Sequence, residues 1–150
     1  MYEPIRTQAR RSVSSARWPA DEAEGTDFPH RSRAEELDIQ LAGHLAALLA
    51  VTDELRARSA PEGRDELDAA AERLVAQISR IRGEVPARGA AAGTHDPAPA
   101  ALHRRAHALA GRALVVAASR ADTTSAILAA QRMDAHEAAV AASAAELASA

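Results

Sequence analysis

The chain has 150 residues and a formal net charge of −3, a size that suits a single domain with a hydrophobic core of its own. It contains no cysteine, which excludes disulfides, cysteine-ligated metals and thiol catalysis. The small net charge gives no global reason to expect binding to nucleic acid.

The first 31 residues predict a disordered tail, because polar and charged residues dominate and prolines and glycine interrupt them. This tail also holds every aromatic residue of the chain, Tyr2, Trp18 and Phe28. Trp18 and Phe28 are therefore candidate partner-binding residues, since short linear motifs use such side chains as anchors. The alternative is that both aromatics fold back onto the helical part of the chain.

A first helix is predicted over residues 33–58. Ser32 and Glu35 have the spacing of a capping box, in which each residue satisfies a backbone N–H group of the other. Leucines then recur every three or four residues along one side of the helix, and His44 takes one of these positions. This pattern predicts an amphipathic helix with its leucine side turned toward a core.

A second helix is predicted over about residues 62–83. Ser59 and Glu62 resemble a second capping box. The turn between the two helices is short, so the second helix must fold back antiparallel to the first. Its predicted apolar side runs from Leu67 to Val85.

A Gly/Pro/Ala-rich linker follows at residues 84–96 and is long enough to run the length of a helix. Beyond it, alanine-rich sequence predicts two helices over about residues 97–120 and 122–148. Asp96-Pro97 is a helix-start signal, and the apolar register changes near Ala121. No glycine or proline enforces a break there, so one long kinked helix is the alternative.

Together these elements predict an all-α fold. The expected architecture is an antiparallel four-helix bundle over residues 32–150, made of two helical hairpins joined by the linker and preceded by the disordered tail. The lysine-free composition, rich in alanine and arginine, is similar to that of small proteins from GC-rich bacteria. That resemblance is compositional and implies no function.

Candidate metal ligands come from the last two predicted helices. His103 and His107 are four residues apart, so both rings lie on one helix face. If the last two helices run antiparallel, Asp134, His136 and Glu137 face this pair and are candidate further ligands. Zinc or iron is the metal that such a site would hold, although most histidine pairs at this spacing are exposed and empty.

No catalytic motif stands out, because the chain has no phosphate-binding loop, no nucleophile elbow and no dinucleotide-binding turn. The sequence therefore predicts a small non-enzymatic cytoplasmic interaction or scaffold protein without a cofactor. Such a protein associates with itself or with a helical partner, and neither nucleic acid nor a membrane is an expected partner. The last predicted helix favours this function, because it is apolar around much of its circumference. The alternative is a metal-binding four-helix bundle.

Overall fold

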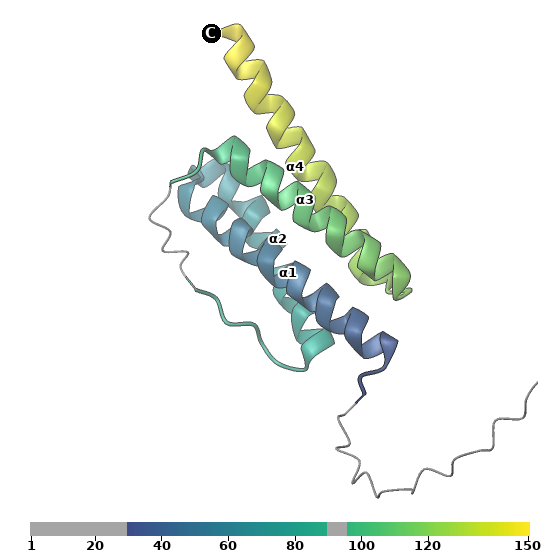
Figure 1. Cartoon of the computed structure of the whole chain (residues 1–150). Helices are drawn as coiled ribbons and strands as arrows, with labels where there is room; N and C mark the ends of the chain where they lie inside the picture. The colour runs from purple at the N-terminus through teal and green to yellow at the C-terminus, as the bar shows by residue number, and fades with distance from the viewer. Residues whose placement is uncertain (1–29, 90–95) are drawn as a thin grey trace, which may run out of the picture. The chain divides into compact units, whose positions relative to one another are not determined.

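The computed structural model describes residues 30–89 and 96–150, and residues 31–150 form one compact unit. Its helices, drawn in Figure 1, are α1 (Arg33–Arg58), α2 (Pro61–Arg82), α3 (Pro99–Ser119) and α4 (Thr123–Ser149). The described residues contain no β-strand, so the all-α prediction is confirmed. Residues 1–29 of the predicted tail and residues 90–95 of the predicted linker lie outside the described part of the chain.

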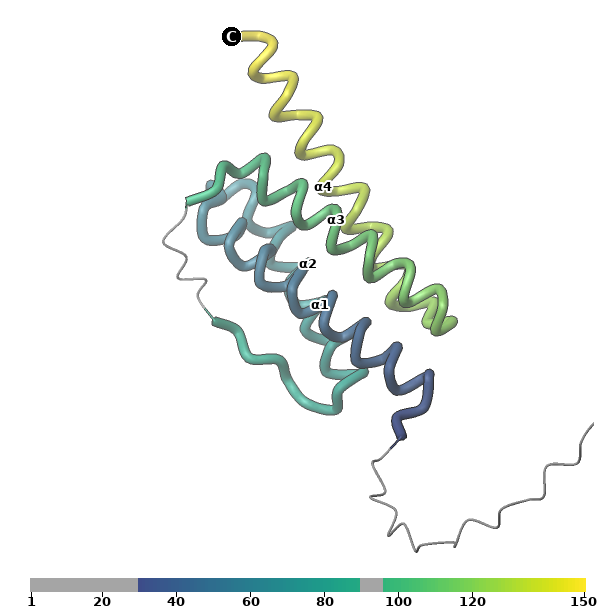
Figure 2. The backbone as a smooth tube through the Cα atoms, viewed as in Figure 1, coloured from purple at the N-terminus to yellow at the C-terminus, as the bar shows by residue number. Residues whose placement is uncertain are grey.

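The helices form a bundle in which α1 packs against both α2 and α3, and α3 packs most extensively against α4. The path of the backbone is easiest to follow in Figure 2. Arg58, at the end of α1, pairs with Asp96 just before α3 at 2.7 Å. Arg120, just after α3, pairs with Asp38 near the start of α1 at 2.9 Å. The two ion pairs therefore lie at opposite ends of the contact between α1 and α3.

The core consists of leucine, isoleucine, valine and alanine side chains. Its largest fully buried apolar residues come from α1, α2 and α3, namely Leu41, Leu45, Leu48, Leu74, Ile78 and Leu102. Alanines such as Ala106 and Ala110 are also fully buried, and their small side chains let neighbouring helices approach closely. No helix of the described chain combines the length and the apolar character needed to cross a membrane.

Two predicted helix starts differ from the observed ones. The capping box of Ser32 and Glu35 is present in full, but the one predicted at Ser59 is wrong. There the N-cap is Ala60, Pro61 occupies the first turn, and the Ser59 hydroxyl donates to the Leu55 carbonyl oxygen instead. The fixed φ of proline suits the first helical position, so Pro61 moves the N-cap one residue past Ser59.

The third helix likewise begins at Pro99 with Ala98 as its N-cap, two residues later than the Asp96-Pro97 signal predicts. A residue that precedes proline is driven out of the helical region by the proline ring. Ala98 is accordingly extended, with ψ of 146°. The second proline of the pair therefore determines where α3 starts.

The alternative of one long helix over residues 97–148 is excluded, because α3 and α4 are separate. Ala121 lies between them with a φ of 56°, a left-handed conformation that is unusual for alanine. Asp122 then caps α4, since its carboxylate accepts from the Ser125 backbone N–H at 3.1 Å. The chain thus reverses at Ala121 without a glycine, and the Asp122 cap stabilises the new helix start.

Candidate functional sites

A histidine pair bridges α3 and α4. The Nδ1 atom of His103 lies 3.0 Å from the Nδ1 atom of His136, and the ring centroids are 5.3 Å apart with planes tilted by 48°. A neutral imidazole carries a proton on only one of its nitrogens. A hydrogen bond along this contact therefore requires one ring to carry its proton on Nδ1 and the other to carry its proton on Nε2.

The His136 side of the pair is buried beside a charged residue. His136 is 1% exposed, and Arg132, four residues earlier on α4, is also buried while its guanidinium pairs with Glu66 of α2. Two polar atoms in this cluster, Arg132 Nε and His136 Nε2, are buried without a hydrogen-bond partner among the described residues. The cluster is thus a polar inclusion in an otherwise apolar contact between helices.

Burial lowers the pKa of both histidines and so favours their neutral form. Loss of hydration lowers the pKa of His136 to about 3, and the positive charge of Arg132 and the nearby His103 and His107 act in the same direction. Burial is also the main cause that lowers the pKa of His103, and the positive charge of Arg132 lowers it further. The negative charge of Glu66 acts in the opposite direction. Neutral imidazole is the form that binds metal ions and the form that can accept a hydrogen bond.

The other candidate metal ligands do not join this pair. His107 is half-buried one turn further along α3, whereas Asp134 and Glu137 are exposed on α4. Within residues 30–89 and 96–150, no group of three His, Cys, Asp or Glu side chains converges in a way that could hold a metal ion. The structure therefore brings together His103 and His136 but not the full predicted set.

Sequence reasoning missed the buried Arg132 and its partner Glu66. The signal was present, because Leu128, Arg132 and His136 follow each other at steps of four and so lie on one face of α4. Arginine is rarely buried, and for that reason the position reads as exposed from sequence alone. His44, predicted on the apolar side of α1, is half-buried at the edge of the core.

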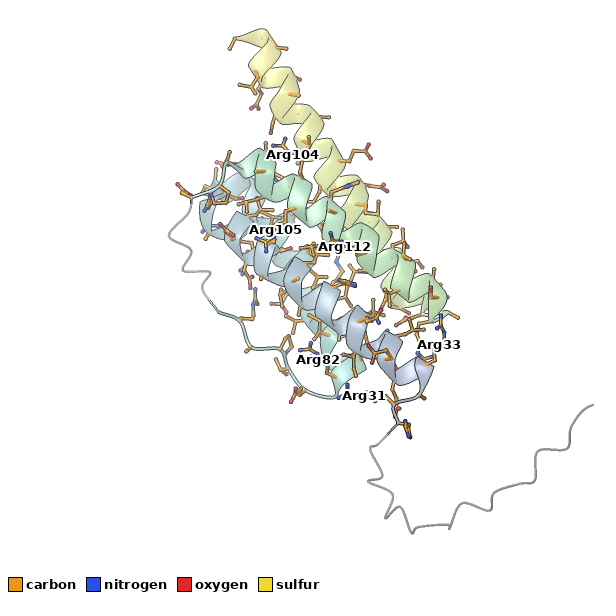
Figure 3. The ribbon with its side chains drawn as sticks, viewed as in Figure 1. Arg31, Arg33, Arg82, Arg104, Arg105 and Arg112 are labelled. Carbon is orange, nitrogen blue, oxygen red and sulfur yellow. The ribbon has the colours of Figure 1, made fainter. Side chains whose placement is uncertain are left out.

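A second feature is the part of α4 formed by residues 137–149, called here the α4 extension. Figure 1 shows α4 continuing past the point where α3 begins. None of these residues is fully buried, and Leu147 is 80% exposed. A shallow groove runs along the base of the extension and is lined by Arg104, His107, Glu137, Val140, Ala141 and Ala144. Arg104 is labelled on α3 in Figure 3.

The predicted partner-binding residues Trp18 and Phe28 lie outside the described residues. Comparisons with protein-family models, with curated proteins and with solved structures found no match. Function is therefore inferred from the chain's own geometry and chemistry, in which the histidine pair and the α4 extension are the two candidates.

Proposed function

We propose that the protein is a small non-enzymatic cytoplasmic interaction or scaffold protein that associates through the α4 extension with a second copy or with a helical partner. In this proposal the helices form an antiparallel bundle of two hairpins, which presents the extension at one end. Neither nucleic acid nor a membrane is a partner. The observation that carries the proposal is the exposure of Leu147, 80% of which is accessible at the end of an alanine-rich helix.

The free energy of apolar burial favours a partner for this segment. Burying a leucine side chain fully contributes about 1.5–3 kcal/mol relative to leaving it exposed. Val140 and Leu147 are spaced as on one helix face, and Val140 is only half-buried. An uncovered helical segment of about a dozen residues is marginal in water, so packing against another helix would stabilise the α4 extension as well as bury these side chains.

The proposal is tested by replacing Leu147 in the full chain with the photo-cross-linking residue p-benzoylphenylalanine and irradiating cells that naturally make the protein. A matched control carries the same residue at Val85, which is 74% exposed after the end of α2. We expect cross-linked protein from position 147 and little from position 85. Equal yields at both positions, or none at position 147, would contradict the proposal.

A metal-binding bundle is the second candidate function, and the contact between His103 and His136 favours it. Zinc–nitrogen bonds of about 2.0–2.1 Å at a tetrahedral angle would hold two ligand nitrogens roughly 3.3 Å apart. The observed separation of 3.0 Å is close to this distance. In this candidate His103 and His136 bind zinc or iron, and His107, Asp134 or Glu137 completes the ligand set after a change of rotamer. The nearby charge of Arg132 opposes a bound cation, although Glu66 offsets it.

Metal binding is tested by titrating zinc and iron(II) into the purified chain and following the melting temperature. A metal that binds the folded state raises the melting temperature, and the variant carrying His103→Ala with His136→Ala should lose that increase. His44→Ala is the matched control, because His44 is a half-buried histidine on α1. An equal metal response in all three proteins would dismiss this site.

A further inference from the structure

We infer that copies of this chain associate head to tail, with an acidic stripe on α2 of one copy lying antiparallel along a basic stripe on α3 of the next. These surfaces are separate from the α4 extension, so the inference goes beyond the proposed function. It follows from the charges on the outer sides of the two helices, from the spacing of those charges, and from the positions of α2 and α3 in the bundle.

The outer side of α3 is basic. The helix contains three arginines, Arg104, Arg105 and Arg112, and no acidic residue, and Figure 3 shows these arginines along its length. All three are exposed, and none has a salt bridge among the described residues. Four residues, called here the basic stripe, follow each other at steps of four, three and four and therefore share one side of the helix: Ala101, Arg105, Ala108 and Arg112.

The basic stripe borders a shallow apolar hollow. Ala108, Gly111 and Val115 are among the residues that line this hollow from α3, and His44 lines it from α1. Val115 is 67% exposed. Alanine at a helix contact lets two backbones approach closely, so a second helix laid along the stripe would also remove part of Val115 from water.

The complementary surface lies on α2. Residues 61–72 carry five acidic residues and one arginine. Four exposed residues, called here the acidic stripe, again follow at steps of four, three and four, on the side of α2 opposite its buried residues: Asp65, Ala69, Glu72 and Ala76. Neither Asp65 nor Glu72 has a salt bridge in the described part of the chain. The nearby Arg73 reaches toward α4, where it donates to Gln131 Oε1 at 3.4 Å.

The two stripes match residue by residue when the helices run antiparallel. The facing pairs, with the α2 residue first, are Asp65 with Arg112, Ala69 with Ala108, Glu72 with Arg105, and Ala76 with Ala101. Each stripe spans about 16 Å along its helix, so both ion pairs and both alanine contacts form together. A parallel arrangement reverses the order of the steps on one helix and moves the central alanines one residue out of line.

The positions of the helices make this contact intermolecular. Among the described residues α2 and α3 do not pack against each other, whereas α1 and α4 each pack against both of them. One copy therefore does not bring its own stripes together, and each stripe is available to a different neighbour. Contact between two unlike surfaces is head to tail, and further copies can add to it. Ion pairs between exposed side chains are individually weak, so the assembly is reversible and sensitive to salt.

A second copy suits the basic stripe better than nucleic acid does. A phosphate backbone would satisfy the arginines, but the net charge of −3 would repel it. The chain itself supplies two carboxylates at the spacing of Arg105 and Arg112, with an alanine between them where the facing helix also has alanine.

The test is sedimentation velocity on the full chain at about 0.01 M ionic strength, where the screening length is about 30 Å. Every protein carries Leu147→Glu, which disrupts association through the α4 extension and so separates this result from the proposed function. The Leu147→Glu chain should self-associate as its concentration rises. Arg105→Glu should weaken that association about tenfold, because it turns an attraction into a repulsion. Arg33→Glu makes the same change in net charge at an exposed position of α1 and should have no effect.

Two double variants with unaltered net charge test the register. Arg105→Glu with Glu72→Arg restores opposite charges at the facing positions and should recover the association. Arg105→Glu with Asp65→Arg leaves like charges facing each other at both ion pairs, so this variant should stay weakly associated.

Three outcomes overturn the inference. A Leu147→Glu chain that stays monomeric at its highest soluble concentration excludes a second copy as the partner of the basic stripe. An equal loss of association in Arg33→Glu and Arg105→Glu shows that net charge alone is responsible. Recovery by the variant with Asp65→Arg in place of the variant with Glu72→Arg excludes the antiparallel register.

Discussion

The two halves of α4 lie in opposite environments. Residues 123–136 bury Leu128, Ala129, Arg132 and His136 against the other helices, whereas residues 137–149 bury nothing completely. Both halves are rich in alanine and carry few charges. The difference arises because α3, the main neighbour of α4, begins at Pro99 and α4 continues past that level (Figure 1). Burial along α4 thus changes where its neighbours end.

The largest predicted contrast comes from the same substitution in each half. Leu128→Ala should lower the free energy of unfolding by about 2–4 kcal/mol, because Leu128 is 5% exposed and its removal leaves a cavity. Leu147→Ala should change it by less than about 0.5 kcal/mol, measured at protein concentrations low enough to keep the chain monomeric. Urea denaturation of both variants measures the difference, and similar losses would contradict the contrast.

Removing the negative charge of Glu66, the partner of the buried Arg132 guanidinium, should lower the free energy of unfolding by less than Leu128→Ala does. Glu66→Gln keeps the shape of the side chain but leaves Arg132 buried without a counter-charge, so the free energy of unfolding should fall by about 1–3 kcal/mol. Water can replace part of the lost interaction, because the Glu66 side chain is 55% exposed. Glu72→Gln, at another exposed position of α2, is the control. An equal effect at both positions would show that the pair contributes little.

Because His136 is buried in the first half of α4, we expect the free energy of unfolding to depend on pH. Folding lowers the pKa of His136 to about 3, so below the ordinary value near 6.5 the unfolded chain takes up a proton that the folded chain does not. The contribution of His136 to the free energy of unfolding is therefore complete above pH 6.5. It is lost as the pH falls, which lowers the free energy of unfolding by about 2 kcal/mol at pH 5. Arg132, His103 and His107 all disfavour the charged ring, while Glu66 favours charge on His103.

The measurement is chemical denaturation at pH 7 and pH 5, with a metal chelator present, for wild type and His136→Leu. Leucine fills a similar volume and cannot titrate, so the variant should lose less stability than wild type between the two pH values. An identical loss in both proteins would show that other groups cause the pH dependence.

The smallest predicted effect concerns the turn that allows α3 and α4 to pack at all. Ala121→Gly should raise the free energy of unfolding by about 0.5 kcal/mol, because glycine adopts the observed φ of 56° without the steric cost that alanine incurs. The same change at Ala118, an exposed position inside α3, should lower it by about 0.5–1 kcal/mol. Thermal melting of both variants distinguishes the two signs, and destabilisation by both would contradict the interpretation.

Helices and helix starts could be predicted from the sequence wherever a single local preference determined the structure. The alanine- and leucine-rich segments predicted helices, and the capping box at Ser32 formed as its spacing predicts. Prediction failed at Ser59 and at Asp96, where a nearby proline competed for the helix start. The outcome there depends on which of two local preferences is stronger, and spacing alone does not reveal that.

The sites were less predictable, because they depend on how helices lie against one another. His103 and His136 were both candidates, yet their direct contact requires the register between α3 and α4. The burial of Arg132 requires a partner on α2, which no local pattern indicates. The last helix was predicted to be apolar around much of its circumference, but which of its residues stay exposed, such as Leu147, depends on how far α3 extends alongside it.

The most direct test of the α4 extension as a covered interface is amide hydrogen exchange along α4 at a series of protein concentrations. Amides of residues 123–136 should be protected at every concentration, because they belong to the packed bundle. Amides of residues 138–148 should exchange quickly in dilute protein and slow down as the concentration rises, with Leu147→Glu shifting that change to higher concentration. Fast exchange of residues 138–148 at all concentrations would contradict self-association through this surface.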